Sequence, residues 1–234
     1  MREIVLDTET TGLDPATGDR IVEIGAIELL NHMPSGKVYH QYINPERSMP
    51  EGAFAVHGLG DAFLADKPVF ASIAQAFLDF IGDAKLVIHN ASFDMKFLNA
   101  ELVWAQRDRL PPDQALDTLE IARRKYPGAQ NSLDALCRRF GVDNSVREKH
   151  GALLDSELLA EVYLELIGGR QPDFGLDAAH LAGTSHAGTP EDTERTSKRE
   201  KALPPRLTPD ELQRHAEFVK SLGKAPLWSK FGSN

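Results

Sequence analysis

Two carboxylates, Asp7 and Glu9, lie two residues apart at the end of an apolar segment near the start of the chain. Residues 3–8 have the composition of a buried strand. In an extended strand, residues i and i+2 project from the same face, so the two carboxylates stand side by side and repel each other. A buried pair of like charges is costly unless a cation lies between them. The alternative is a polar strand end that runs into a Thr-Gly turn.

Two further acidic residues each follow a histidine. Asp94 comes after His89-Asn90, where a short strand turns into a helix, and Asp155 comes five residues after His150. A spacing of five does not fit one helix face, so we expect His150 on a loop and Asp155 in the first turn of a helix. A loop histidine suits a proton acceptor. Taken separately, Asp94 is also explained by the helix dipole, and His150 as an exposed loop histidine.

The elements that must position these residues follow from periodicity. Strands are predicted over residues 3–8, 20–28, 37–44 and 85–89, and helices over 70–81, 92–105, 116–126, 132–140 and 155–167. Asn131 and Asp134 resemble a capping box for the helix at 132. Strands first, then strand and helices in alternation, indicate an α/β fold. Its mixed sheet combines an antiparallel meander with parallel strands and is flanked by helices.

Beyond residue 170 the apolar periodicity fades. We expect a body over residues 1–170, a flexible linker over 171–205 and a helical docking tail over 206–234. Thr208 and Pro209 are typical of a helix start. Trp228 and Phe231 follow as apolar anchors of the kind that docking peptides use. A disordered end without function is the alternative for this tail.

The net charge of the 234 residues is −9. This argues against a protein that grips nucleic acid by bulk electrostatics, but it permits an enzyme whose metal ions supply positive charge locally. The segment from Arg195 onward is basic, so an acidic body carries a basic tail. Cys137 is the single cysteine, which favours a reducing, cytoplasmic compartment. We expect no leader before the first strand and no membrane-spanning segment.

In this order, the motifs Asp-x-Glu, His-Asn-x-x-Phe-Asp and His-x-Ala-x-x-Asp resemble the signature of the DEDDh exonucleases, which share a ribonuclease H-like fold. The likeness extends to Val56-His57-Gly58 and to the segments at 7–12, 131–137 and 150–155. These segments resemble the proofreading epsilon subunits of bacterial DNA polymerase III. The resemblance covers roughly residues 2–170, and the tail is similar in layout only.

This resemblance implies a phosphodiester hydrolase that uses two divalent metal ions. Oxygen ligands without cysteine suit Mg²⁺ or Mn²⁺. In similar enzymes the residue at Asp7 bridges both metals, those at Glu9 and Asp155 hold the metal that carries the attacking water, and that at Asp94 supports the second metal. His150 would take the proton from that water, and the products would be nucleoside 5′-monophosphates.

The resemblance also implies a site for the terminal nucleotide after the first strand. The residues expected to contact it are Thr10, Thr11, Gly12 and Leu13, with Gly12 permitting close backbone approach. His57 is a further candidate substrate contact, and a packed or surface histidine is the alternative.

The partners implied are a single-stranded or frayed 3′ DNA end and the alpha subunit of the polymerase, bound through the C-terminal tail. Gln171, Phe174 and Leu176 form a weak version of a sliding-clamp-binding peptide, with ordinary linker as the alternative. A small theta-like subunit is a further candidate partner. The hypothesis is a proofreading 3′–5′ exodeoxyribonuclease. An exoribonuclease that trims RNA ends and a polymerase-stabilising interaction subunit are the alternatives.

Overall fold

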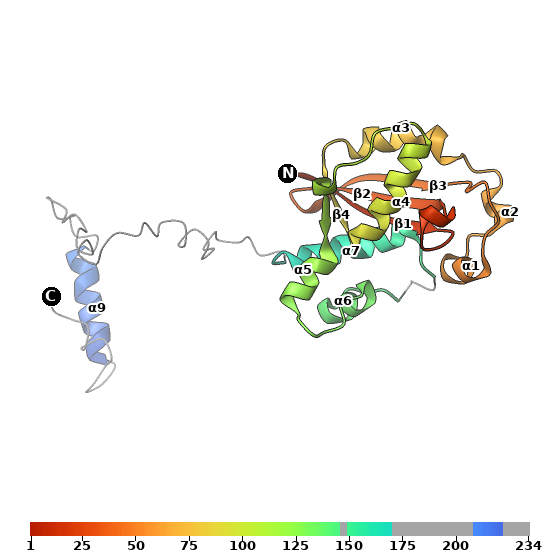
Figure 1. The fold of residues 1–234 in the computed structure, drawn as a ribbon. Coiled ribbons are helices and arrows are strands. Elements are labelled where there is room, and N and C mark those ends of the chain that lie inside the picture. Colours follow the sequence, from red (N-terminus) through yellow and green to blue (C-terminus); the bar gives the residue numbers. More distant parts are fainter. Residues whose placement is uncertain (146–148, 170–207, 222–234) are drawn as a thin grey trace, which may run out of the picture. The chain divides into compact units, whose positions relative to one another are not determined.

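The computed structural model describes residues 1–145, 149–169 and 208–221. The chain divides into two units (Figure 1): one holds the body, whose described part ends at Gly169, and the other holds helix α9 (Pro209–Ser221). The body is built on a five-stranded sheet in the order β3-β2-β1-β4-β5.

The sheet is mixed, as the sequence predicts. β1 (Arg2–Thr10), β2 (Ile21–Leu30) and β3 (Met33–Tyr42) form an antiparallel meander. β4 (Lys85–Ile88) pairs parallel to β1, and β5 (Ala115–Asp117) pairs parallel to β4. β1 is therefore a central strand, and its carboxyl end lies beside the carboxyl end of β4.

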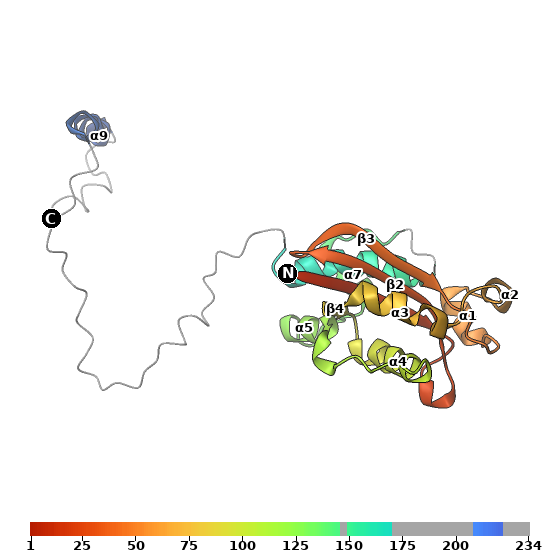
Figure 2. The same cartoon turned by 90° about the horizontal axis from the view of Figure 1, so that it is seen from above.

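Helices cover both faces of the sheet (Figure 2). α3 (Phe70–Ile81) and α4 (Ala91–Trp104) cover one face, and α7 (Ala152–Leu166) covers the other. α5 (Thr118–Lys125) and α6 (Leu133–Phe140) form a small cluster with α7. The short elements of the body are α1 (Glu51–His57), α2 (Asp61–Leu64) and the 3-10 turns η1 (Pro15–Thr17) and η2 (Pro112–Gln114).

Alternation along β1 decides which side of the sheet each side chain serves. Ile4 and Leu6 belong to the core under α3 and α4, whereas Val5 belongs to the core under α7. By the same alternation, Asp7 and Glu9 project toward the α7 side, and Thr8 projects toward α4. The side-by-side carboxylates that the sequence predicts therefore face the helix that begins just after His150.

Glycine at position 25 allows α7 to approach this part of the sheet. Gly25 is the cross-strand partner of Asp7. A Cβ added to Gly25 would lie 2.3 Å from the backbone of Ala152 and Leu153, so only glycine fits. The Ser156 hydroxyl donates to the Gly25 carbonyl at 2.9 Å. The first turn of α7 is thus held directly beside Asp7.

Two boundaries differ from the sequence expectations because the deciding signals are short. The helix predicted over 116–126 is in fact β5 followed by α5, since a three-residue strand carries too little periodicity to detect. α7 begins at Ala152, about a turn earlier than predicted. Gly151 has an extended backbone and is the N-cap of this helix.

The start of α6 and the start of β3 also differ. Ser132, and not Asn131, caps α6: its hydroxyl accepts from the Ala135 N–H at 3.3 Å. Asn131 instead donates to the carbonyls of Tyr126 and Ala129. β3 includes Pro34-Ser35-Gly36, which the sequence analysis placed before the strand, because an edge strand with a register irregularity tolerates proline.

The second unit has one described element, α9. Thr208 caps it as predicted, and the Glu211 carboxylate accepts from the Thr208 N–H at 2.8 Å, which completes a capping box. The predictions for Gln171, Phe174, Leu176, Trp228 and Phe231 lie outside the described residues. Within the described ranges, every helix is too short or too polar to cross a bilayer.

The close approach at Gly25 gives a first prediction. Gly25→Ala should lower the free energy of unfolding by about 3 kcal/mol, because the added methyl meets backbone that cannot rotate away. Urea unfolding measures this. Gly36→Ala in β3 is the matched control: its φ is +88° but it has open space, so the cost should stay near ~1 kcal/mol. Equal costs would show that α7 does not require glycine at position 25.

Candidate active site

All five residues singled out by the three motifs line one cleft at the carboxyl end of β1. The cleft has a volume of about 310 Å³. Asp7 and Glu9 come from β1, Asp94 from the first turn of α4, His150 from the loop before α7 and Asp155 from the first turn of α7. Segments that are far apart in the sequence thus place four carboxylates and one imidazole around the same space.

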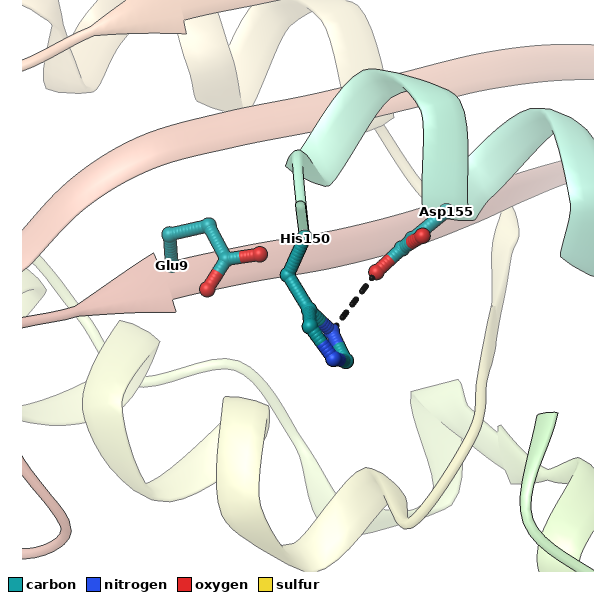
Figure 3. A group of neighbouring side chains, drawn as sticks. All are labelled: Glu9, His150 and Asp155. Carbon is teal, nitrogen blue, oxygen red and sulfur yellow. Dashed lines mark ion pairs between the residues drawn. The ribbon is translucent and has the colours of Figure 1, made fainter. Parts of the chain in front are cut away.

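Glu9, His150 and Asp155 form the tightest group in this cleft (Figure 3). One ligand atom from each lies within 4.8 Å of the others. Glu9 and Asp155 are 8% and 3% exposed, so two negative charges lie close together with little water around them. Such an arrangement is costly without a cation, and the oxygen and imidazole donors are those that divalent metal ions accept in proteins.

His150 is the exposed member of the group. Its Nδ1 lies 3.2 Å from Asp155 Oδ2, and 49% of its side chain is exposed, against 4% for Asp155. A neutral imidazole that carries its proton on Nδ1 donates to this carboxylate and keeps Nε2 as a proton acceptor. As the sequence predicts, His150 lies on a loop and Asp155 lies in the helix.

Asp94 reaches the cleft from the opposite side of the sheet. The Thr8 hydroxyl donates to Asp94 Oδ1 at 2.7 Å, and only 3% of Asp94 is exposed. Burial raises the pKa of Asp94 to about 7, although the bond from Thr8 opposes the rise and the charge of Asp117 adds to it. A cation next to Asp94 would favour its charged form instead.

The turn before α4 is held by residues of β5 and α5. Asn90 has a left-handed backbone, φ +67°, and its N–H donates to Asp117 Oδ1 at 3.0 Å. His89 Nδ1 lies 2.9 Å from the Thr118 hydroxyl. These contacts fix the orientation of the turn between β4 and α4. They also fix where α4, and with it Asp94, begins.

The residues predicted to contact the terminal nucleotide lie just outside the carboxylate cluster. Thr10 and Thr11 are buried, and Leu13 is 79% exposed. A Cβ added to Gly12 would lie 2.3 Å from the Asp19 carboxylate. The group that closely approaches Gly12 in this structure is therefore the side chain of Asp19. His57 is 6% exposed at the end of α1 and does not line the cleft.

Sequence reasoning missed several residues that shape this cleft. Thr8 has no distinctive signal, because a threonine in a strand is common. Its position directly after Asp7 is the one feature of the sequence that points to it. Asn90 and Asp134 also line the cleft, whereas Asp117 acts one step away by holding Asn90. The hydrogen bond between Asp117, at the end of β5, and Asn90, in the turn after β4, has no signal in the sequence.

Comparisons with known proteins agree with this geometry. The family model described as Exonuclease (RNase_T) matches residues 4–163. The DNA polymerase III subunit epsilon of Rickettsia felis is 52% identical over 227 residues, which is 96% of this chain and 98% of the relative. The corresponding subunit of Haemophilus influenzae is 44% identical over 250 residues (100% and 97%), and that of Escherichia coli is 49% identical over 177 residues (72% of each).

Solved structures support the fold. A structure of exonuclease X in complex with 5′ overhanging duplex DNA is similar with a TM-score of 0.55 and 26% identity, covering 70% of this chain and 90% of that one. The nuclease domain of 3′hExo, a DEDDh family member bound to rAMP, has a TM-score of 0.62 at 19% identity, covering 71% and 91%. This second likeness concerns the fold alone.

The ribonuclease H-like sheet and the acidic cleft at the carboxyl end of its central strand define an exonuclease. The chain belongs to the exonuclease family whose model it matches. Enzymes of this family depend on divalent metal ions. Within it, the chain belongs to the epsilon subunits of DNA polymerase III.

The buried Asp94 gives a prediction for the metal-free protein. Its pKa in the folded state, about 7, is above the value of 3.8 expected when unfolded. Between these values the folded state binds the proton and the unfolded state does not, so stability from this group falls as pH rises from about 4 to about 7. Urea unfolding in the presence of a chelator should show this fall.

Asp94→Asn provides the control, because the amide oxygen can still accept from Thr8 and cannot titrate. The difference in stability between this variant and the wild type should grow in the variant's favour between pH 5 and pH 8. A difference that is independent of pH would contradict a raised pKa at Asp94.

Proposed function

We propose that this protein is the proofreading 3′–5′ exodeoxyribonuclease of a replicative DNA polymerase III. It removes mispaired 3′-terminal nucleotides as 5′-monophosphates. The observation that carries this proposal is the convergence of Asp7, Glu9, Asp94, His150 and Asp155 on one cleft. The high identity to epsilon subunits along nearly the whole chain supports the association with the polymerase.

The donor set fits two divalent metal ions, Mg²⁺ or Mn²⁺. Asp7 lines the same cleft as the other three carboxylates and would help to hold both ions. Glu9 and Asp155 would hold one ion, and Asp94 would support the other. When bound, the ions supply an activated water and stabilise the leaving 3′ oxygen.

The protein's own groups move the proton and fix the geometry. His150 Nε2 takes a proton from the attacking water, while Nδ1–H remains bonded to Asp155 and keeps the imidazole oriented. Thr8 orients the Asp94 carboxylate through its hydroxyl. Because Glu9, Asp94 and Asp155 are almost fully buried, their carboxylates are held by packing and lose little entropy when they bind a cation.

The loop after β1 contacts the terminal nucleotide. Residues Thr10–Leu13 are held by buried polar contacts: Thr10 donates to the Gly12 carbonyl at 2.7 Å, and the Thr11 N–H donates to the Arg20 carbonyl at 2.9 Å. Leu13 then projects into solvent, where a base or sugar can pack on it. His57 supports this loop from within the body, because its buried ring lies near the Thr10 backbone.

The C-terminal region binds the polymerase. α9 exposes Leu212 and Phe218, at 50% and 61%, without a buried residue among the ones described. A helix that exposes apolar residues in this way is typical of a segment that docks into a groove on a partner. We assign binding of the alpha subunit to the 206–234 tail. The 171–205 linker tethers this tail to the body, and its residues Gln171, Phe174 and Leu176 bind a sliding clamp. A theta-like subunit would be a third partner, bound to the 1–170 body.

DNA is favoured over RNA as substrate. The relatives that match along nearly the full length are subunits of a DNA polymerase, whereas the structure bound to rAMP shares only the fold. An interaction subunit without catalysis is disfavoured, because every residue of the acidic set is present and in place.

The catalytic assignment is tested with a 3′-mismatched DNA primer. Asp7→Asn should reduce the rate of nucleotide release roughly 10³-fold or more, because a metal ligand worth several kcal/mol in the transition state is lost. The unfolding transition should stay close to that of the wild type. Retained Mg²⁺- or Mn²⁺-dependent trimming by a folded Asp7→Asn protein would refute the two-metal assignment.

The docking assignment is tested by placing a charge on either side of α9. Leu212→Glu should weaken binding to the purified alpha subunit at least roughly tenfold, because a charge would be buried at the interface. Gln213→Glu adds the same charge at a neighbouring polar position and should have little effect. Both variants should keep the wild-type rate on primer ends. Equal binding by the two variants would remove α9 from the interface.

A further inference from the structure

The loop that carries His150 is held against α1. The His150 N–H donates to the Val56 carbonyl at 3.2 Å. Lys149 Nζ lies 5.1 Å from the centre of the Phe54 ring, within the range of a cation–π contact. The stem of Lys149 passes over Gly58, where an added Cβ would lie 2.8 Å from Lys149 Cδ. We call Phe54, Val56 and Gly58 the α1 platform.

The α1 platform is itself firmly attached to the body. His57, between Val56 and Gly58, is 6% exposed, and its Nδ1 accepts from the Leu59 N–H at 3.0 Å. Gly58 ends the helix in a left-handed conformation, φ +75°, and its N–H donates to the Phe54 carbonyl at 2.8 Å. The platform therefore offers the His150 loop a fixed surface.

The position of the imidazole depends on the loop that carries it. Half of the His150 side chain is exposed, and its Nδ1 lies 3.2 Å from Asp155 Oδ2. A shift of a loop backbone carries its side chain along, so a loop that is not held moves Nε2 by ångströms. A displacement of about 1 Å in a reacting group can cost 10²-fold in rate.

We propose that the α1 platform and Lys149 position His150 for proton transfer. This inference rests on the proposed function of His150 as the proton acceptor. Phe54 and Lys149 pack on each other beside the His150 loop, Gly58 leaves room for the Lys149 stem, and none of the three lines the cleft. In this proposal they act through His150 and not on the substrate. They are positioning residues, and their loss should lower kcat while leaving substrate and metal binding unchanged.

The chain offers matched controls for both kinds of contact. Phe63 is 44% exposed with Lys67 Nζ 4.6 Å from its ring centre, much as Phe54 is 46% exposed with Lys149 above it. The Phe63 pair belongs to α2 and the segment after it, and not to the α1 platform. Gly141 caps α6 with φ +70° and has nothing within 4 Å of an added Cβ. Gly141→Ala thus reproduces the backbone strain of Gly58→Ala without displacing a lysine.

The experiment measures steady-state release of nucleotides from single-stranded DNA by the full-length protein with saturating Mn²⁺. Phe54→Ala, Lys149→Met and Gly58→Ala should each lower kcat roughly 10-fold with KM and the Mn²⁺ requirement within about twofold of the wild type. Lys149→Arg keeps the cation–π contact and should restore most of the rate. Phe63→Ala and Gly141→Ala should keep the wild-type kcat.

A double variant separates positioning from direct substrate contact. Once His150→Ala has removed the imidazole, adding Phe54→Ala should change the residual rate by less than about twofold, because a residue that acts through His150 has nothing left to position. A further loss in the double variant, a rise in KM for Phe54→Ala, or equal kcat values for Phe54→Ala and Phe63→Ala would each overturn the inference.

The same variants distinguish a failure of the role proposed for His150 from a failure of the role proposed for the α1 platform. If His150→Ala retains the wild-type kcat, the proposed role of His150 fails and the positioning role fails with it. If His150→Ala loses activity while Phe54→Ala, Lys149→Met and Gly58→Ala do not, the proposed function stands and the α1 platform is overturned alone.

Discussion

Electrostatic repulsion among four carboxylates, three of them almost fully buried, is the constraint on which the rest of this structure depends. Asp7, Glu9, Asp94 and Asp155 meet at the carboxyl end of a central strand, where little water remains to screen them. Such a cluster persists only if folding elsewhere outweighs its cost and if a cation relieves it in use. Burial of Asp94 away from water raises its pKa, and the charge of Asp117 adds to the rise.

Close packing on one face and an ion pair on the other hold the framework around the cluster. Gly25 lets α7 pack against the sheet beside Asp7, so Asp155 arrives on a helix and not on a loop. On the other face, Arg20 donates two bonds of 2.8 Å to Glu101 of α4, which ties the loop after β1 to the helix that carries Asp94. A strand and two helices therefore carry the four carboxylates of the cleft, while His150 lies on a loop.

The acidic cleft and helix α9 belong to different parts of the chain. The residues that line the cleft lie in the body that the exonuclease model matches, whereas α9 carries exposed apolar side chains and no residue of the cleft. The Rickettsia relatives match over 96% of the chain, and the Escherichia coli relative matches over 72%.

The sequence alone determined the mixed sheet, the long helices and five of the residues that line the cleft, because period-two and period-3.6 patterns and the spacing of the acidic motifs are local signals. It placed His150 on a loop and Asp155 in a helix by spacing alone. The tertiary structure decided what depends on contacts between distant segments. β5, the hold of Asp117 on Asn90, the bond from Thr8 to Asp94 and the need for glycine at position 25 have no local signature. Each arises only when two separate elements come within a few ångströms of each other.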